Sequence, residues 1–291
     1  MASQLPRSRG TLYAMPPQMH KNFRKDNTFI SDFEKLTEIG IDLSQQFKGI
    51  YAPTRRLGYS TRTLAKIIDN CVSILRLMPG SIFFDDEDAY LDFPSVASLC
   101  RDLIEACNYN WYLSIERISK SETDLRLEVN DFHDFFELMQ MAKLLTLNKT
   151  DFEYLQGRIE EHRVNIESSE IFNNLDKQKK SLILKGKQGM ILTQFEIAER
   201  RKLNLDKFKG IYKLLSNQTH SSANSIKMLT YSRLYDEENI LQEALTAIIV
   251  EYCNRFLAST ILNVGRIWKI EFAKPESEEL VKRYARRIKN K

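Results

Sequence analysis

The chain has 291 residues, of which 43% are hydrophobic and 28% are charged, and its formal net charge is +4. This much apolar material builds a sizeable core, which excludes a disordered chain, and so mild a charge excess does not by itself indicate nucleic-acid binding. Only 10 glycines and 7 prolines are present, although these residues punctuate β-sandwiches, barrels and nucleotide-binding loops. The composition therefore favours helices.

Residues 1–28 predict a flexible basic tail. The segment is poor in acids, rich in proline, serine and glutamine, and lacks the apolar stretch of a secretory signal. A mitochondrial presequence shares part of this composition, but the prolines and Gly10 would interrupt its amphipathic helix.

Apolar residues at three- and four-residue steps predict helices through the first part of the chain. These helices cover residues 29–49, 60–78, 94–118, 121–147 and 151–175. Ser60 is the expected N-cap of the second helix, and Pro94 with Ser95 opens the third. The third helix has a continuous apolar face around Leu103, so we expect it at the centre of the core.

The lysine-rich segment 176–192 has weak periodicity, which predicts a long loop or a partial helix and the best internal break of the domain. Two further helices are expected over residues 192–204, with Thr193 near the start, and 205–220. The last long helix, 237–270, carries Glu243, Glu251 and Arg255 inside its apolar stretch, which indicates a buried helix rather than a membrane span.

We therefore predict an all-α protein, with a single helical domain over residues 29–272 folded as a helical bundle. No alternation of apolar and polar residues typical of strands is present, and no repeat of 20 to 50 residues is evident. Residues 273–291 are expected to form a charged C-terminal helix or a frayed tail with a basic end.

The sequence lacks the motifs typical of several classes of enzyme. No G-x-G-x-x-G, G-x-x-x-x-G-K-[ST], H-E-x-x-H or G-x-S-x-G sequence occurs, so we expect no nucleotide cofactor, no metal and no serine-hydrolase site. The cysteines form no C-x-x-C pair, which predicts four buried thiols in a reducing, cytoplasmic location: Cys71, Cys100, Cys107 and Cys253.

Four histidines are candidates for acid–base chemistry near neutral pH. His20 lies in the predicted tail. His162 lies among charged residues, which predicts a solvated helix face, and His133 is expected to make a packing contact. His220 differs, because it ends a helix on which Tyr212 and Ser216 precede it at steps of four.

The first candidate site is thus the end of the 205–220 helix, where Lys213 and Asn217 lie beside the stripe formed by Tyr212, Ser216 and His220. A helix C-terminus favours the charged form of histidine through the helix dipole. The stripe forms one wall of a polar pocket in this interpretation, and in the alternative it is a C-cap with ordinary surface side chains.

A second polar stripe lies on the expected central helix, where Arg101, Glu105, Asn108 and Tyr112 recur at steps of three and four. Polar groups on a central helix need polar partners, because unpaired buried groups are costly. We predict that Glu105 accepts a hydrogen bond from His220 or Arg101; the alternative is an exposed ion pair between Arg101 and Glu105.

Together, the S-x-x-R-x-x-x-E segment (Ser98, Arg101, Glu105) and the Y-x-x-x-S-x-x-x-H segment (Tyr212, Ser216, His220) resemble helical families related to the HEPN superfamily, over roughly residues 94–266. The resemblance implies a HEPN-like core with additional N-terminal helices. HEPN proteins are helical bundles, often dimeric, and many are metal-independent ribonucleases of toxin or antiviral systems.

In those enzymes an arginine holds the phosphate, and a histidine that follows it after four to six intervening residues performs acid–base cleavage through the RNA 2′-hydroxyl. Here Lys213 stands where that arginine would precede His220, and a lysine holds a phosphate only as a point charge. The resemblance thus implies His220 as the acid–base residue, Lys213 or Arg101 as the phosphate grip, and Glu105 and Asn217 as orienting residues.

Two functions remain open from the sequence. One is a HEPN-like protein that cleaves or binds RNA, in which the resemblance also implies a homodimer. The other is a non-catalytic helical module that binds protein or nucleic acid through its basic ends, with the polar stripes serving only to specify packing.

Overall fold

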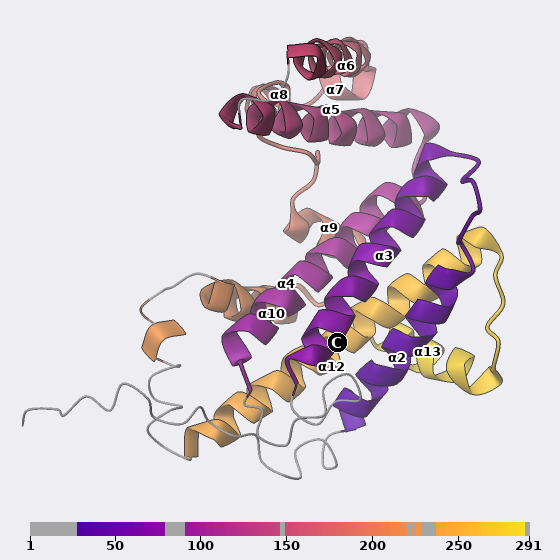
Figure 1. Ribbon diagram of the computed structural model, residues 1–291, viewed down its shortest axis with the longest axis vertical. Helices are drawn as coiled ribbons and strands as arrows, with labels where there is room; N and C mark the ends of the chain where they lie inside the picture. The colour runs from indigo at the N-terminus through magenta and orange to yellow at the C-terminus, as the bar shows by residue number, and fades with distance from the viewer. Residues whose placement is uncertain are drawn as a thin grey trace, which may run out of the picture.

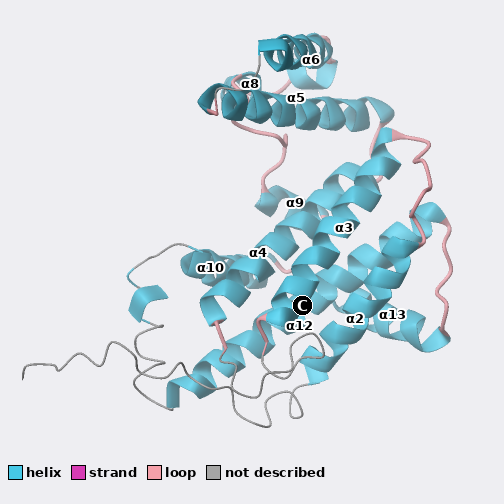
Figure 2. Ribbon diagram, viewed as in Figure 1, coloured by secondary structure: helices cyan, strands magenta, loops and turns pink. Residues whose placement is uncertain are grey.

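The computed structural model describes residues 28–78, 91–145, 149–219, 223, 225–227 and 237–288. Within these ranges every regular element is a helix and no strand is present, as Figure 2 shows. The prediction of an all-α helical bundle is confirmed. The predicted tail, residues 1–28, falls outside the described residues except for Thr28.

The larger layer is a bundle around one hydrophobic core (Figure 1). Its helices are α2 (Thr28–Gln45), α3 (Arg55–Arg76), α4 (Phe93–Asn110), α10 (Leu205–Thr219), α12 (Glu237–Trp268) and α13 (Pro275–Arg287). Helix α4 packs against α3, α10 and α12, so the expectation that it is central to the core is correct. Leu103 on α4 and Phe256 on α12 are fully buried there.

A second, smaller layer lies across one end of the bundle, at the top of Figure 1. It contains α5 (Lys120–Leu144), α6 (Lys149–Glu167), α7 (Glu170–Asn173) and α8 (Lys177–Leu184), which enclose a separate hydrophobic cluster. Helix α8 forms part of the lysine-rich segment, and the chain then returns to the bundle through α9 (Gln194–Arg200).

The link between the two layers is a short π-helix, η1 (Trp111–Ile115), that continues α4. The expected helix over 94–118 therefore ends as an α-helix at Asn110. The π-turn places Tyr112 and Leu113 in the second cluster, whereas Cys107 belongs to the first. Such insertions are local departures from the i→i−4 pattern, and residue spacing alone does not predict them.

Two predicted helix starts shift. Thr54, not Ser60, caps α3, because its hydroxyl accepts from Leu57 N–H at 3.2 Å. Ser60 instead is buried inside α3. Helix α4 begins one residue earlier than expected, with Asp92 as the N-cap. The cap at Thr193 is confirmed as a capping box with Glu196.

One described helix, Leu241–Trp268, is long and apolar enough to cross a membrane by length and composition, but 67% of its apolar window is buried inside the protein. It packs against α2, α3, α4 and α13. Its apolar character is thus accounted for by its place in the core.

The prediction of a solvated face for His162 is wrong. The ring is 2% exposed, contacts Glu128 through Nδ1 at 2.8 Å and stacks on Phe135 with 5.4 Å between ring centroids. Ile159 and Ile166, three residues before and four after, are also buried. These three residues share one helix face, so the apolar spacing placed His162 inside despite its charged neighbours in sequence.

The C-terminal segment docks as helix α13. Val281 and Tyr284 are buried, and the Tyr284 hydroxyl and Arg283 Nη2 each donate to Asp32 Oδ2 at 2.7 Å. Of the charged helix and the frayed tail expected here, the helix is present, and the basic end up to Ile288 is part of the folded bundle.

Candidate functional site

The two predicted polar stripes meet where α4 packs on α10. Arg101 Nε donates to Glu105 Oε1 at 2.9 Å, and Arg101 Nη2 donates to the Tyr212 hydroxyl at 3.2 Å. The Tyr212 hydroxyl in turn donates to Glu105 Oε1 at 2.5 Å. We call these three residues the Arg101 cluster. The bond predicted from Arg101 to Glu105 is present, and it is at the same time the ion pair of the alternative interpretation, with side chains that are partly exposed (24% and 32%).

Aromatic packing holds the cluster in place. The Tyr212 ring stacks on Phe208, with 5.7 Å between centroids, and meets Phe195 edge-on at 5.4 Å. The Arg101 guanidinium lies 5.1 Å from the centroid of the Tyr212 ring, within cation–π range. Arg101 and Glu105 are one turn apart on α4, so their pairing follows directly from the helix repeat.

Electrostatics keep Arg101 charged and Tyr212 protonated. Burial raises the pKa of Tyr212, and its hydrogen bond to Glu105 raises it further, so the phenol stays protonated at neutral pH. Burial opposes the charge of Arg101, but its bonds to Tyr212 and Glu105 outweigh this effect and raise its pKa. Within the described residues Arg101 Nη1 makes no hydrogen bond, which leaves a donor for an anion.

The remaining residues predicted on α10 have separate positions. Lys213 is exposed and has no ion pair among the described residues. The Ser216 hydroxyl donates to the Tyr212 carbonyl at 2.7 Å, so its proton is used within the helix. Asn217 is half-buried. His220 lies outside the described residues, one position beyond the end of α10 at Thr219.

Asn108 does not join the Arg101 cluster. It is fully buried, donates to Gln194 Oε1 at 2.8 Å and accepts from Arg201 Nη1 at 2.6 Å. Tyr112, the next residue of the predicted stripe, is buried in the second layer. The stripe is therefore polar but mostly internal, because α4 is covered on nearly every side at this depth.

Sequence reasoning missed Arg201. It lies at the C-cap of α9 and is only 5% exposed. A signal was present: Arg201 follows the buried Ile197 and Ala198 by four and three residues, so helical spacing places it on the buried face of α9. Its basic neighbours, Arg200 and Lys202, obscured that signal.

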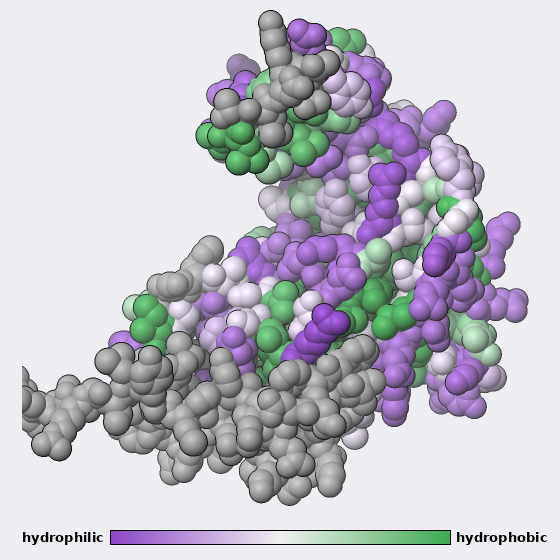
Figure 3. All heavy atoms as spheres, viewed as in Figure 1, coloured by the Kyte–Doolittle hydropathy of each residue, from purple (hydrophilic) through white to green (hydrophobic). Residues whose placement is uncertain are grey.

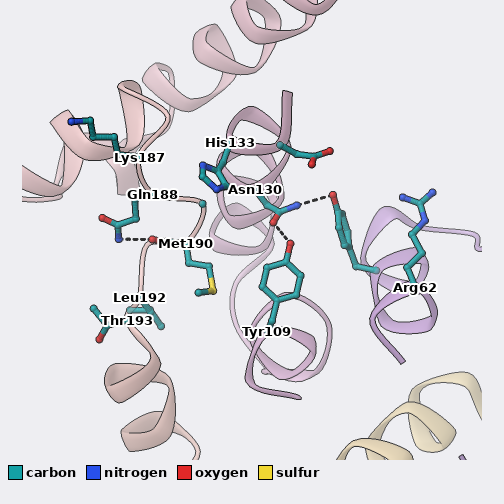
Figure 4. Close-up of a pocket in the computed structure, with 12 residues that line it drawn as sticks. Arg62, Tyr109, Asn130, His133, Lys187, Gln188, Met190, Leu192 and Thr193 are labelled. Carbon is teal, nitrogen blue, oxygen red and sulfur yellow. Dashed lines mark hydrogen bonds between the residues drawn. The ribbon is translucent and has the colours of Figure 1, made fainter. Parts of the chain in front are cut away.

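A pocket of about 630 Å³ lies between α3, α5 and the loop that follows α8 (Figure 4). Asn130 is at its centre: it accepts from the Tyr109 hydroxyl and donates to the Tyr59 hydroxyl at 2.8 Å. The pKa values of both phenols are raised, chiefly by burial. His133 contacts the Gly186 carbonyl at 2.8 Å, which is the packing contact expected for it.

Metal and thiol chemistry find no support in the described residues. No group of three or more His, Cys, Asp or Glu side chains among them is placed to hold a metal ion. The four cysteines are buried, as predicted. Burial raises the pKa of the Cys107 thiol to about 11 and raises those of Cys71 and Cys253, so these thiols are protonated at neutral pH.

No family model, curated protein or solved structure matches this chain.

Proposed function

We propose that this protein is a HEPN-like helical bundle that acts on RNA as a metal-independent ribonuclease, of the kind that serves in toxin or antiviral defence systems. One observation carries the proposal: two polar segments 111 residues apart in sequence, Arg101 and Tyr212, join with Glu105 in one partly exposed cluster. His220 follows Tyr212 by two helical turns in sequence.

In the proposed reaction the RNA 2′-oxygen attacks the adjacent phosphorus, its proton passes to a base, and the 5′-oxygen of the next nucleotide leaves with a proton from an acid. The products are a 2′,3′-cyclic phosphate and a 5′-hydroxyl. His220 performs the proton transfers, and Arg101 holds the phosphate through its remaining donor. Glu105 and the Tyr212 hydroxyl fix the orientation of the guanidinium.

The test is cleavage of a mixed RNA pool by the purified full chain in the presence of a metal chelator. We expect His220→Ala to reduce the rate at least about a hundredfold, as removal of an acid–base group does. Arg101→Gln should raise KM more than Arg101→Lys does, because lysine retains the charge. Lys209→Gln is the control, because it removes an exposed charge from α10, the helix that carries Tyr212.

Intact RNA after incubation with the wild type, or equal cleavage by His220→Ala, would contradict the proposal. Far-ultraviolet circular dichroism of each variant shows whether a lost rate reflects a lost fold.

A non-catalytic interaction module is the second candidate, and a surface patch on α5 favours it. Leu138, Met141, Leu144 and Leu145 are exposed at the C-terminal end of α5, where Figure 3 shows hydrophobic atoms gathered. Exposed apolar patches commonly mark interfaces. We expect the chain to form a homodimer through this patch.

Light scattering coupled to size-exclusion chromatography tests the homodimer. Met141→Glu with Leu144→Glu should convert a dimer to a monomer, whereas the exposed pair Glu38→Gln and Asp42→Asn should not. A wild-type chain that stays monomeric at high concentration rules out this surface as a self-association site.

A further inference from the structure

A strongly basic pocket of about 640 Å³ lies between the end of α9, helix α12 and helix α13. Among the described residues its lining contains no carboxylate and six cationic side chains: Arg200, Arg201, Lys202, Arg266, Lys282 and Arg286. We call it the Arg201 pocket. Neither the Arg101 cluster nor the pocket around Asn130 shares a residue with it.

Arg201 lies buried at the bottom of this pocket. Its guanidinium lies 4.8 Å from the centroid of the Phe256 ring and donates to two neutral oxygens, Asn108 Oδ1 at 2.6 Å and Ser259 Oγ at 3.4 Å. No carboxylate among the described residues pairs with it. A buried charge without a counter-charge is costly, so a bound anion would be strongly favoured here.

Arg126, the other buried arginine among the described residues, is paired differently. Arg126 is 1% exposed and forms ion pairs with Glu116 at 2.6 Å and with Glu122 at 2.5 Å. Arg200, the residue before Arg201, turns to the same two carboxylates. Glu116 and Glu122 thus pair with both Arg126 and Arg200. Within the described part of the chain, Arg201 donates to neutral oxygens and lines the basic pocket.

Helix dipoles do not account for all of this positive charge. Arg200 and Lys282 already pair with glutamates, which leaves four lining cations without an ion pair in the described structure. Arg201, Arg266 and Arg286 lie at or near the C-terminal ends of α9, α12 and α13. Each such end carries roughly half a negative charge, so three of them offset about one and a half of the four positive charges.

We propose that the Arg201 pocket binds a phosphate group, with Arg201 as the buried anchor and Lys202, Arg266 and Arg286 at the mouth. The remaining positive charge is close in magnitude to the charge of roughly −2 that a phosphate monoester carries. The volume lies within the range of about 300–1,000 Å³ typical of small-ligand sites, so it accommodates a phosphorylated small molecule or one unit of a nucleic acid. This site is independent of the proposed ribonuclease.

The first test is titration of the full chain with inorganic phosphate by calorimetry, at an ionic strength held constant with chloride. We expect saturable binding to the wild type. The double variant Arg266→Gln, Arg286→Gln should weaken it at least about tenfold, because it removes two charge-assisted contacts from exposed positions. The control, Lys35→Gln with Arg76→Gln, removes two exposed charges outside the pocket and should leave the affinity unchanged.

Lys202 offers a second, sharper test. It adopts a left-handed conformation with φ 58°, in a helix-ending turn closed by Leu203 N–H to the Ala198 carbonyl at 3.0 Å. Glycine is preferred at such a position. Lys269, with φ 55°, ends α12 in the same way but does not line the pocket.

Replacement of either lysine by glycine should therefore raise the melting temperature slightly, by about 1–3 °C. Only Lys202→Gly should weaken phosphate binding, about three- to tenfold. Equal affinities in the two variants, or a wild type that binds phosphate no better than chloride, would overturn the proposal.

The source of the phosphate is decided by comparing inorganic phosphate, a nucleoside monophosphate and a short single-stranded RNA. Much tighter, salt-dependent binding of the RNA, lost in the Arg266→Gln, Arg286→Gln variant, identifies a nucleic-acid backbone. Preference for the monophosphate identifies a small phosphorylated ligand. His220→Ala should retain the phosphate affinity in either case, so failure of the ribonuclease proposal does not affect this test.

Discussion

Replacing Arg126 by methionine is expected to cost about 3 kcal/mol of unfolding free energy, whereas the same replacement of Arg201 is expected to cost nothing or to stabilise the fold. Both guanidinium groups are buried. Loss of one partner from a buried ion pair costs about 3–5 kcal/mol, because the other charge is left uncompensated. The lower end applies to Arg126, since Arg200 still contacts Glu116 and Glu122 at 3.2 and 3.1 Å.

Arg201→Met removes a charge that has no carboxylate partner among the described residues and retains an apolar chain against Phe256. Burial lowers the pKa of Arg201 to about 10, which shows how unfavourable this position is for a cation without an anion. In this variant Asn108 and Ser259 each lose a hydrogen-bond donor, and this loss limits the gain in unfolding free energy.

Urea unfolding in a buffer without phosphate measures both effects, and repetition with phosphate separates them. The wild type and Arg126→Met should both gain stability from phosphate, while Arg201→Met should gain none. If Arg201→Met proves as destabilising as Arg126→Met in the absence of phosphate, the guanidinium is satisfied within the fold and needs no anion.

The sequence predicts the fold class well because each helix depends mainly on its own apolar spacing. The sequence also indicates Arg101, Glu105 and Tyr212 as site residues, because a polar stripe on a central helix requires polar partners. Tyr212 on α10 is such a partner. Asn108 shows the limit: whether a polar stripe is exposed depends on how many helices cover it, and periodicity carries no information on that number.

Arg201 and His162 were missed for one shared reason. Both lie in charged stretches of sequence, so composition suggested solvent exposure, yet both share a helix face with buried isoleucines. The helix repeat outweighs local composition when the face is already fixed by apolar residues on either side. The π-helix after Asn110 is a third case, because it depends on packing between the two layers.

Phe256 physically connects the two candidate sites, and its removal is expected to affect both. Its ring is fully buried, with Arg201 4.8 Å from its centroid and Phe208 6.4 Å away, and Phe208 in turn stacks on Tyr212. Truncating a buried phenylalanine to alanine costs about 3–5 kcal/mol, and the cavity would let the Arg201 side chain leave its position.

Phe33→Ala is the matched control, because Phe33 is equally buried on α2 but belongs neither to the lining of the Arg201 pocket nor to the Arg101 cluster. Urea unfolding should give similar losses for the two variants. Phosphate titration under conditions where both remain folded should then separate them: Phe256→Ala loses affinity at least severalfold, and Phe33→Ala retains that of the wild type. Equal affinities would mean that Arg201 is held by Asn108 and Ser259 alone, without the aromatic support between the sites.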